Sequence, residues 1–461
     1  HQRLREIMTA TPLTIVVLGA GKGTRMKSDL PKVMHKIAGR PMLGHVLDVA
    51  AATGANQIAV VIGPNMDAVG VGARAFSPQA QIFVQAEQLG TADAVKAALP
   101  VLKAFTGDVI VLYADTPLLQ PATLERLRKV LAEGAAAAVL GFEAADPTGY
   151  GRLLTDANGT LTAIREEKDA TTAERQIQIC NSGVMAFRVN DMAAVLARIS
   201  NDNAKGEYYL TDAIEVIATM GGRAAVVTCP ESEVLGVNDR GQLAEAEAIF
   251  QTRRRGEAMA AGATLIAPET VWFSHDTRLG RDVVIQPNVF FGPGVVVEDG
   301  VEILANCHIE GTHIGSGARI GPFARLRPGA QLGTGVHIGN FVEVKNVKMG
   351  QGAKANHLAY LGDGSVGDRA NIGAGTIFCN YDGFFKHQTS VGKEAFVGSN
   401  SALVAPVTIG DGAYVGSGSV ITKDVSAGSL ALERSSQVER PTWAEKFRLM
   451  MSKKKKAEAK T

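Results

Sequence analysis

Apolar residues recur at every sixth position through most of the second half of the chain, with short five-residue steps that lead to Ile314, Met349 and Val366. Glycine follows many of them, as in Ile314-Gly315 and Val397-Gly398. This repeat is typical of a parallel β-helix, in which three hexads complete one triangular coil and each repeated side chain points toward the axis. We expect the repeated residues to form the hydrophobic core of the β-helix and to have no catalytic role. They are Leu279, Ile285, Phe291, Val297, Ile303, Ile309, Ile314, Ile320, Leu326, Leu332, Ile338, Val344, Met349, Ala355, Leu361, Val366, Ile372, Phe378, Val391, Val397, Leu403, Ile409, Val415 and Ile421.

The repeat is broken by residues 378–389, which read F-C-N-Y-D-G-F-F-K-H-Q-T. This segment should loop out of the prism, and insertions in such repeats commonly lie on the binding face. The chain ends in a basic segment, residues 441–461, with four consecutive lysines from Lys453 to Lys456. A solvated tail is the usual interpretation of such a run, and binding of an anionic ligand is the alternative.

The first half of the chain has a different periodicity. From Thr14 to about Asn238, short β-rich apolar runs such as T-I-V-V-L and D-V-I-V-L-Y alternate with helical stretches. This alternation is typical of βαβ units and predicts an α/β, Rossmann-like domain with a mainly parallel sheet. Ligands of such sheets bind beyond the carboxyl ends of the strands, so the loops after Leu18 and Tyr113 are candidate sites.

Residues 240–262 are rich in Ala, Glu, Gln and Arg and contain no proline, which predicts one long helix joining the two halves. The chain therefore divides into an α/β domain over 8–239, a linker helix over 240–262, a β-helix over 263–440 and a basic tail over 441–461. Residues 1–7 precede Met8 and are left out of this assignment.

The composition narrows the possible functions. Lys plus Arg is 47 and Asp plus Glu is 46, so the chain has no overall basic character to attract nucleic acid. No segment approaches the length of a membrane-spanning helix, and the start of the sequence lacks the apolar core of a signal peptide. The cysteines form no C-x-x-C pair. We expect a cytoplasmic protein without nucleic-acid or membrane partners.

The strongest local motif is L-G-A-G-K-G-T-R-M at 18–26, directly after an expected strand and followed by Pro31-Lys32. Its glycines let the backbone approach an anion, and Lys22, Arg25 and Lys32 can supply charge to polyphosphate oxygens. It is not a Walker A loop, because the chain contains no G-x-x-x-x-G-K-[ST] string. It is not a G-x-G-x-x-G fingerprint either, because Thr24 occupies the last glycine position. The motif predicts a polyphosphate site, and a merely tight strand-to-helix turn is the alternative.

This motif resembles the signature of the sugar-1-phosphate nucleotidylyltransferases. With a hexapeptide β-helix after it, nearly the whole chain resembles the bacterial bifunctional N-acetylglucosamine-1-phosphate uridylyltransferase and glucosamine-1-phosphate N-acetyltransferase family. Further matching strings are Q-A-E-Q-L-G-T (85–91), D-P-T-G-Y-G-R (146–152), E-K-D-A-T (167–171), G-E-Y-Y-L-T-D (206–212), G-V-N-D-R (236–240), G-P-F-A-R-L-R-P-G-A (321–330) and N-I-G-A-G-T (371–376). The resemblance implies a left-handed β-helix and, by analogy with related acyltransferases, a homotrimer with active sites between subunits.

In the first domain, the resemblance implies uridylyl transfer from UTP to N-acetylglucosamine 1-phosphate with release of pyrophosphate. Arg25 and Lys32 are then catalytic, and Asp115 and Asn238 are the Mg²⁺ ligands. A lone Asp at a strand end is otherwise often only a helix cap. The positions matching UTP or UDP-N-acetylglucosamine contacts are Leu18, Gly19, Ala20, Gly21, Lys32, Gln85, Gly90, Thr91, Tyr113, Ala114, Asp115, Gly151, Glu166, Asn181 and Asn238.

In the β-helix, the resemblance implies transfer of acetyl from acetyl-CoA to the amine of glucosamine 1-phosphate. His357 matches the general base, and Glu343 could orient or polarise it. The sugar-phosphate contacts correspond to Arg327, Lys345, Tyr360 and Asn371, and the acetyl-CoA contacts to Ala374, Asn380, Tyr381, Ser399, Ser417 and Arg434. The two reactions together would supply UDP-N-acetylglucosamine for peptidoglycan and lipopolysaccharide precursors.

Three positions depart from the family pattern. Ala92 and Ala114 stand where the family commonly has glycine, and a methyl group there could tighten the nucleotide site. Ser417 replaces a commoner alanine. Two other functions are alternatives to this interpretation. One is a single-activity nucleotidylyltransferase whose β-helix serves only in assembly or regulation of the protein, and the other is a non-enzymatic scaffold. His357 with Asn380 and Tyr381 argues against the first, and retention of Arg25, Lys32, Asp115 and Asn238 argues against the second.

Overall fold

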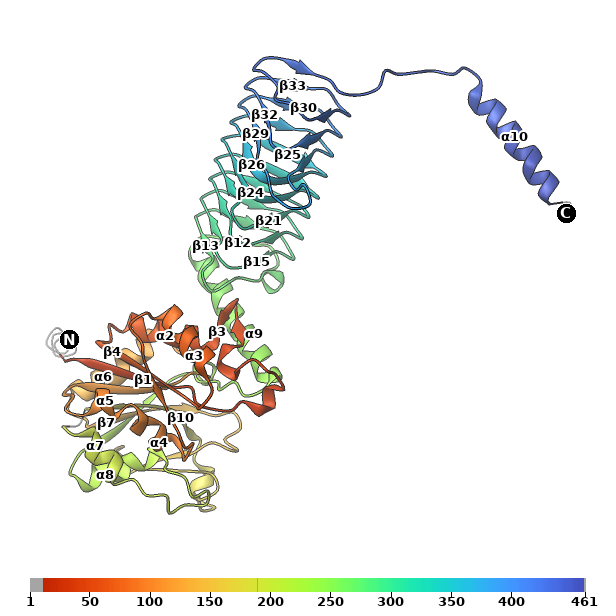
Figure 1. Ribbon diagram of the computed structural model, residues 1–461. Coiled ribbons are helices and arrows are strands. Elements are labelled where there is room, and N and C mark those ends of the chain that lie inside the picture. Colours follow the sequence, from red (N-terminus) through yellow and green to blue (C-terminus); the bar gives the residue numbers. More distant parts are fainter. Residues whose placement is uncertain (1–10, 189, 460–461) are drawn as a thin grey trace. The chain divides into compact units, whose positions relative to one another are not determined.

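A computed structural model describes residues 11–188 and 190–459 and divides the chain into two compact units (Figure 1). Unit 1 is His1–Ala260 with Trp272–Thr277, and unit 2 is Ala261–Val271 with Arg278–Thr461. Unit 1 is an α/β domain and unit 2 a left-handed parallel β-helix, so the fold predicted from the two periodicities and the family resemblance is confirmed. The domain start at residue 8 lies outside the described residues. Among the helices described, none has the length and apolar character needed to cross a bilayer.

Unit 1 is built on a nine-stranded sheet in the order β5-β4-β1-β6-β10-β7-β11-β9-β8. β1 pairs in parallel with β4 and β6, and β10 runs antiparallel to β6 and β7. All of β1 is buried, because Val16 and Val17 point to opposite faces and each joins a separate apolar cluster. The strands are β1 (Leu13–Leu18), β4 (Gln57–Ile62), β5 (Gln81–Val84), β6 (Asp108–Tyr113), β7 (Ala137–Glu143), β8 (Arg152–Thr155), β9 (Leu161–Arg165), β10 (Ile179–Phe187) and β11 (Ala224–Thr228).

Helices pack around this sheet and complete unit 1. They are α2 (Met42–Ala52), α3 (Asp67–Phe76), α4 (Thr91–Ala97), α5 (Leu99–Leu102), α6 (Pro121–Ala132), α7 (Met192–Ala197), α8 (Ala213–Thr219) and α9 (Arg240–Ala260). A small two-stranded sheet joins β2 (Lys36–Ile37) to β3 (Arg40–Pro41). Helix α9 is the long helix predicted from the composition of this region.

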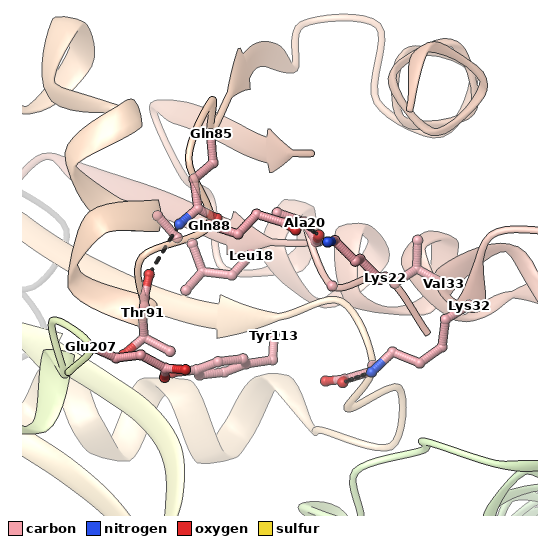
Figure 2. A pocket seen from close by; sticks show the side chains of 15 residues that line it. Leu18, Ala20, Lys22, Lys32, Val33, Gln85, Gln88, Thr91, Tyr113 and Glu207 are labelled. Atoms are coloured by element: carbon pink, nitrogen blue, oxygen red, sulfur yellow. Dashed lines mark hydrogen bonds and ion pairs between the residues drawn. The ribbon is translucent and has the colours of Figure 1, made fainter. Parts of the chain in front are cut away.

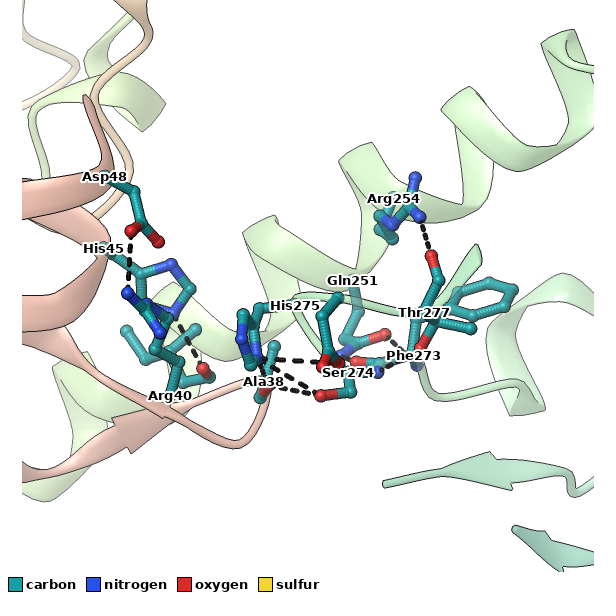
Figure 3. Close-up of polar contacts among 12 residues, drawn as sticks. Ala38, Arg40, His45, Asp48, Gln251, Arg254, Phe273, Ser274, His275 and Thr277 are labelled. Atoms are coloured by element: carbon teal, nitrogen blue, oxygen red, sulfur yellow. Dashed lines mark hydrogen bonds and ion pairs between the residues drawn. The ribbon is translucent and has the colours of Figure 1, made fainter. Parts of the chain in front are cut away.

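The segment Trp272–Thr277 returns to unit 1 and is fastened there by polar contacts (Figure 3). Gln251 on α9 donates from Nε2 to the carbonyl of Phe273 at 2.7 Å and accepts the amide of Phe273 at 2.8 Å. The amide of His275 donates to the carbonyl of Ala38 at 2.9 Å. Because Gln251 is only 1% exposed, these bonds satisfy a side chain that water cannot reach.

Asp108, at the start of β6, is the most enclosed carboxylate of the sheet. Its side chain is 0% exposed, and two arginines neutralise it. Arg128 of α6 donates from Nε to Oδ2 at 3.0 Å, and Arg188 after β10 donates from Nε to Oδ1 at 2.6 Å. This charge cluster ties α6 and the end of β10 to the centre of the sheet.

Replacing Asp108 by asparagine is expected to destabilise unit 1 by about 3–5 kcal/mol, because two partly buried guanidinium groups lose their counter-charge. Calorimetric unfolding of the full chain should show the unit 1 transition moving to lower temperature. Glu133→Gln, which removes an exposed partner 3.9 Å from Lys129, should shift it hardly at all. Equal shifts in both variants would contradict the role assigned to Asp108.

Unit 2 consists of short parallel strands that stack coil upon coil, from β12 (Thr264–Leu265) to β35 (Leu430–Ala431). Most span two or three residues, and the longest are β24 (Glu343–Met349) and β26 (Tyr360–Val366). Pairing in register places Ile303, Ile320 and Ile338 in one column. The repeated apolar positions are buried as predicted, except that Leu279 in the first coil is only half-buried.

Close stacking of coils explains one of the glycines of the repeat. A Cβ at Gly339 would lie 1.8 Å from the carbonyl oxygen of Asn356 in the next coil, which no side chain could tolerate. The break in the repeat leaves the prism as a hairpin in which Tyr381 pairs with Lys386, and Phe384 and Phe385 are exposed. The basic tail forms helix α10 (Trp443–Glu458), whose side chains are all exposed.

Candidate active sites

The glycine-rich segment directly follows β1 and folds back onto Lys32. The amide of Gly19 donates to the carbonyl of Val61 at 2.8 Å, and Thr24–Met26 form a single 3₁₀ turn. Gly23 has φ 62°, and a Cβ there would lie 2.5 Å from Cβ of Lys32. Only glycine therefore allows the segment to close over Lys32.

This segment borders a pocket of about 320 Å³ beyond the carboxyl ends of β1 and β6, where the sequence predicted a ligand site (Figure 2). Of the predicted nucleotide contacts, the pocket is lined by Leu18, Gly19, Ala20, Gly21, Lys32, Gln85, Gly90, Thr91, Tyr113 and Asp115, joined by Lys22 of the phosphate motif. Val33, Gln88, Ala94 and Glu207 also line the pocket and were not predicted as contacts from the sequence. Glu207 belongs to the quoted string at 206–212, so that string was a usable signal.

Gln85 has a fixed orientation in this pocket. It is 5% exposed and donates from Nε2 to Oδ2 of Asp93 at 2.8 Å and to the carbonyl of Gly90 at 3.1 Å. With its Nε2 committed to these acceptors, the amide keeps Oε1 as its acceptor. An acceptor held in this way can recognise an N–H at the edge of a base.

Other predicted residues of this site lie outside the pocket lining. Arg25 is exposed on the 3₁₀ turn. Ala114 is 0% exposed and joins the apolar core, where its methyl group lies 3.5 Å from the position of a Cβ on Gly19. Ala92 is likewise buried in the other apolar cluster. The two alanines that depart from the family pattern therefore fill the core rather than narrow the pocket.

The predicted sugar contacts Gly151, Glu166 and Asn181 lie together. The amide of Asn181 donates to the carbonyl of Gly151 at 2.8 Å, and a Cβ on Gly151 would lie 3.4 Å from Oε1 of Glu166. Burial raises the pKa of the Glu166 carboxyl, and Asp169 adds to this shift against the charge of Lys205. Burial also raises the pKa of the Tyr113 phenol, to which Asp115 and Glu166 contribute. Tyr113, which lines the nucleotide pocket, is therefore close enough to Glu166 to feel its charge, so the predicted sugar contacts lie near that pocket.

Asp115 and Asn238 converge on one point. Lys32 donates from Nζ to Oδ2 of Asp115 at 2.5 Å and to Oδ1 of Asn238 at 3.1 Å. A carboxylate and an amide oxygen are hard donors of the kind Mg²⁺ prefers, so the residues fit the expected ion. The described residues include no cluster of three or more His, Cys, Asp or Glu side chains suited to a metal. Phosphate and water oxygens would therefore have to complete the coordination.

The β-helix carries a second polar cluster on β21 (Arg325–Arg327), β24 and β26, whose strands pair in register. Arg327 donates to Oε1 of Glu343 at 2.8 Å. Lys345 donates to both carboxylate oxygens of Asp363 at 2.9 and 3.0 Å. Three predicted sugar-phosphate residues, Arg327, Lys345 and Tyr360, thus lie on neighbouring coils of one sheet, while Asn371 lies on β27 (Asn371–Ile372) of the other sheet.

Asp363 is the centre of this cluster and was missed by the sequence analysis. It is 3% exposed and also accepts hydrogen bonds from Asn346 at 2.9 Å and from Asn380 at 2.7 Å. Burial alone would raise the pKa of Asp363, but the hydrogen bonds from Asn346, Lys345 and Asn380 hold it below its ordinary value. The sequence shows only that an acidic residue lies in a short step of the repeat. This does not reveal which residues of other coils the carboxylate contacts.

His357 ends β25 (Lys354–His357) and is exposed. Its Nδ1 donates to Oδ1 of Asn340 in the preceding coil at 2.8 Å. Glu343, which was expected to orient His357, is instead paired with Arg327. Asn340, which pairs in register with His357 in the preceding coil, makes the hydrogen bond to the ring that was expected from Glu343.

Four of the predicted acetyl-CoA residues, Ala374, Ser399, Ser417 and Arg434, are connected by hydrogen bonds between the coils that follow His357. The amide of Gly375 donates to the carbonyl of His357 at 3.2 Å, the amide of Asn400 to that of Ala374 at 2.7 Å, and the amide of Gly418 to that of Ser399 at 2.8 Å. Ala374, Ser399 and Ser417 directly precede the three donor residues in the sequence, and they lie in successive coils. Arg434 donates to the carbonyl of Ser417 at 2.5 Å. Tyr381 instead lies on the exposed hairpin, where its hydroxyl donates to the carbonyl of Gly383.

Each half of the chain matches a known protein family. Residues 15–178 match the MobA-like NTP transferase domain family, and residues 311–346 and 388–423 match the bacterial transferase hexapeptide family. The fold and the two sites define a two-part transferase, with a nucleotidyltransferase domain ahead of a hexapeptide-repeat acyltransferase domain. A solved structure of UDP-glucose pyrophosphorylase complexed with UDP-glucose is 17% identical, covering 53% of this chain and 100% of that chain with a TM-score of 0.44.

Whole-length relatives identify the family. A bifunctional protein GlmU from Azorhizobium caulinodans is 60% identical, covering 97% of this chain and 100% of that protein. Those from Xanthobacter autotrophicus and Sphingopyxis alaskensis are 57% and 53% identical over 97% of this chain, and the matches cover 100% and 99% of those proteins. The chain belongs to the family of bifunctional GlmU proteins. It is an enzyme with uridylyltransferase and N-acetyltransferase activities, so neither a single activity nor a scaffold role describes it.

Proposed function

We propose that unit 1 forms UDP-N-acetylglucosamine in the pocket beside β1, with a Mg²⁺ ion held by Asp115 and Asn238. We propose further that the β-helix acetylates glucosamine 1-phosphate with acetyl-CoA, using His357 as the base, and so supplies the substrate of unit 1. The observation that carries the assignment is the meeting of Lys32, Asp115 and Asn238 at the pocket closed by the glycine-rich segment. This arrangement offers oxygen donors and an ammonium group beside a space lined by backbone amides.

In the uridylyl transfer, a phosphate oxygen of N-acetylglucosamine 1-phosphate attacks the α-phosphorus of UTP. The bond to the β-phosphate oxygen breaks, and pyrophosphate leaves with that electron pair. Lys22, Lys32 and Arg25 offset the negative charge of the phosphates, and the bound ion would add further neutralisation. Gln85 accepts from the uracil edge, and Glu166 accepts from sugar hydroxyls. The chain contributes positioning and charge, which suits phosphoryl chemistry.

In the acetyl transfer, the amine of glucosamine 1-phosphate attacks the thioester carbonyl, the carbon–sulfur bond breaks, and CoA leaves as the thiolate with that electron pair. The hydrogen bond from Nδ1 to Asn340 leaves Nε2 as the basic nitrogen of a neutral ring, ready to take the amine proton. Arg327 and Lys345 provide charge for the sugar phosphate, and Arg434 provides charge for the phosphates of acetyl-CoA.

We also propose a cytoplasmic homotrimer. Within one chain, His357 ends a strand of one sheet and Tyr360 begins a strand of another, with both on the outside of the prism. A site spread around an exposed corner would be enclosed if a second copy covered it. Light scattering of the purified protein would give the mass of three chains.

A coupled assay tests the two activities. Purified protein is given glucosamine 1-phosphate, acetyl-CoA, UTP and Mg²⁺, and free CoA and pyrophosphate are followed separately. We expect CoA release to precede pyrophosphate release, with N-acetylglucosamine 1-phosphate restoring pyrophosphate release when acetyl-CoA is left out. Pyrophosphate release with no release of CoA under any condition would overturn the acetyltransferase proposal.

Asp363→Asn should raise KM for glucosamine 1-phosphate by about tenfold, because Lys345 loses the charge-assisted bonds that hold its ammonium group. Uridylyl transfer in the same molecule should be unchanged and reports that the chain is folded. Asp368→Asn is the matched control, since that exposed carboxylate accepts from the backbone amide of Gln351. A fall in kcat with KM unaltered would show that Asp363 does not position the substrate.

A further inference from the structure

Lys32 occupies an unusual position for a residue of a nucleotide pocket. Its side chain is 10% exposed, and its ammonium nitrogen contacts Oδ2 of Asp115 and Oδ1 of Asn238, the two residues proposed to hold the ion. The approach of Gly23 to Cβ of Lys32 keeps the base of the side chain in place. The flexible stem beyond Cβ still lets the ammonium group turn toward the pocket that Lys32 lines.

We propose that Lys32 competes with the divalent ion for Asp115 and Asn238, so that the ion binds tightly only when nucleotide phosphates draw the ammonium group away. An ammonium group on Oδ2 of Asp115 would lie close to a divalent cation bound to the same carboxylate, and two positive charges at such a distance repel each other. The phosphates of UTP offer Lys32 a second set of acceptors, to which the glycine-rich segment gives access. This inference rests on the proposed metal site and adds an order of binding to it.

The competition makes nucleotide and metal binding mutually dependent. Breaking the contact between Lys32 and Asp115 costs free energy that the ion must supply when it binds alone. When nucleotide is present, the new contacts between Lys32 and phosphate oxygens offset that cost. The coupling is reciprocal, so the ion in turn favours the orientation of Lys32 that binds phosphate.

Binding of Mn²⁺ to the full-length protein without nucleotide tests this, with free Mn²⁺ measured by electron paramagnetic resonance. We expect Lys32→Met to bind Mn²⁺ at least about tenfold more tightly than the unsubstituted protein, because a competing cation is removed. Lys22→Met is the matched control: Lys22 lines the same pocket and is exposed. Its substitution should change the affinity by less than about threefold. Acetyl transfer by each variant reports correct folding.

The variants separate failure of this inference from failure of the metal site. Lys32→Met combined with Asp115→Asn should lose the tight Mn²⁺ site. If it loses that site while Lys32→Met alone binds no more tightly than the unsubstituted protein, the competition is overturned and the metal site stands. If Asp115→Asn leaves Mn²⁺ binding unchanged in both backgrounds, the proposed metal site itself is wrong and the competition falls with it.

Discussion

Alanine in place of Asp115 should lower uridylyl transfer by about 10²–10³-fold or more while acetyl transfer continues at its normal rate. Asp115 supplies the carboxylate of the proposed metal site and the partner of Lys32, so its loss removes both the ion and the orientation of the ammonium group. Pyrophosphate release from UTP and N-acetylglucosamine 1-phosphate measures the effect, and CoA release in a parallel reaction measures the second activity.

The matched control for Asp115 is Asp29→Ala. Asp29 is an exposed carboxylate in the loop between the glycine-rich segment and Lys32. Its removal should change pyrophosphate release by less than about twofold, since an exposed surface charge contributes little. If Asp115→Ala kept normal uridylyl transfer, the pocket beside β1 would not be the site of that reaction.

Alanine in place of His357 should lower acetyl transfer by about 10²–10⁴-fold and leave uridylyl transfer unchanged, because the amine loses the base that takes its proton. Release of CoA at saturating acetyl-CoA measures the loss. Asn340→Ala should give a smaller fall and alter the pH profile of kcat, since Asn340 fixes the ring nitrogen that acts.

His308→Ala is the matched control for His357. His308 is exposed on an earlier coil, where its ring stacks on Phe290 with centroids 4.9 Å apart. The His308→Ala substitution should have no effect on CoA release. Retention of normal acetyl transfer in His357→Ala would show that another group takes the amine proton.

The two periodicities were enough to predict an α/β domain and a β-helix, and most residues of the first pocket were predicted through the family resemblance. Positions such as Ile303 and Ile338 are decided by periodicity alone, and the charge of Lys32 beside a polyphosphate was suggested by the glycine-rich motif. These are local patterns, and a sequence displays them directly. Asp115 was assigned through the resemblance, because its place at the end of a strand alone is equally typical of a helix cap.

The contacts between coils could not be predicted in this way. Asp363 meets Lys345 across 18 positions, and Asn340 meets His357 across 17. These pairs depend on how many residues each coil contains, which varies with every short step of the repeat. Glu343 was therefore expected to contact His357 but pairs with Arg327, and the contact between Asn340 and His357 was not predicted. The burial of Ala114 was missed because the side of β6 from which its methyl group projects is a property of the assembled sheet.

The return of Trp272–Thr277 to unit 1 means that the uridylyltransferase is not encoded by one uninterrupted stretch of chain. A shortened protein ending at Ala260 would strip the buried amide of Gln251 of both partners supplied by Phe273. A protein ending at Thr277 would keep them. Anyone isolating the nucleotide-binding half by cutting the gene should therefore place the stop after Thr277, since a cut at the end of the long helix removes a piece of the domain it is meant to preserve.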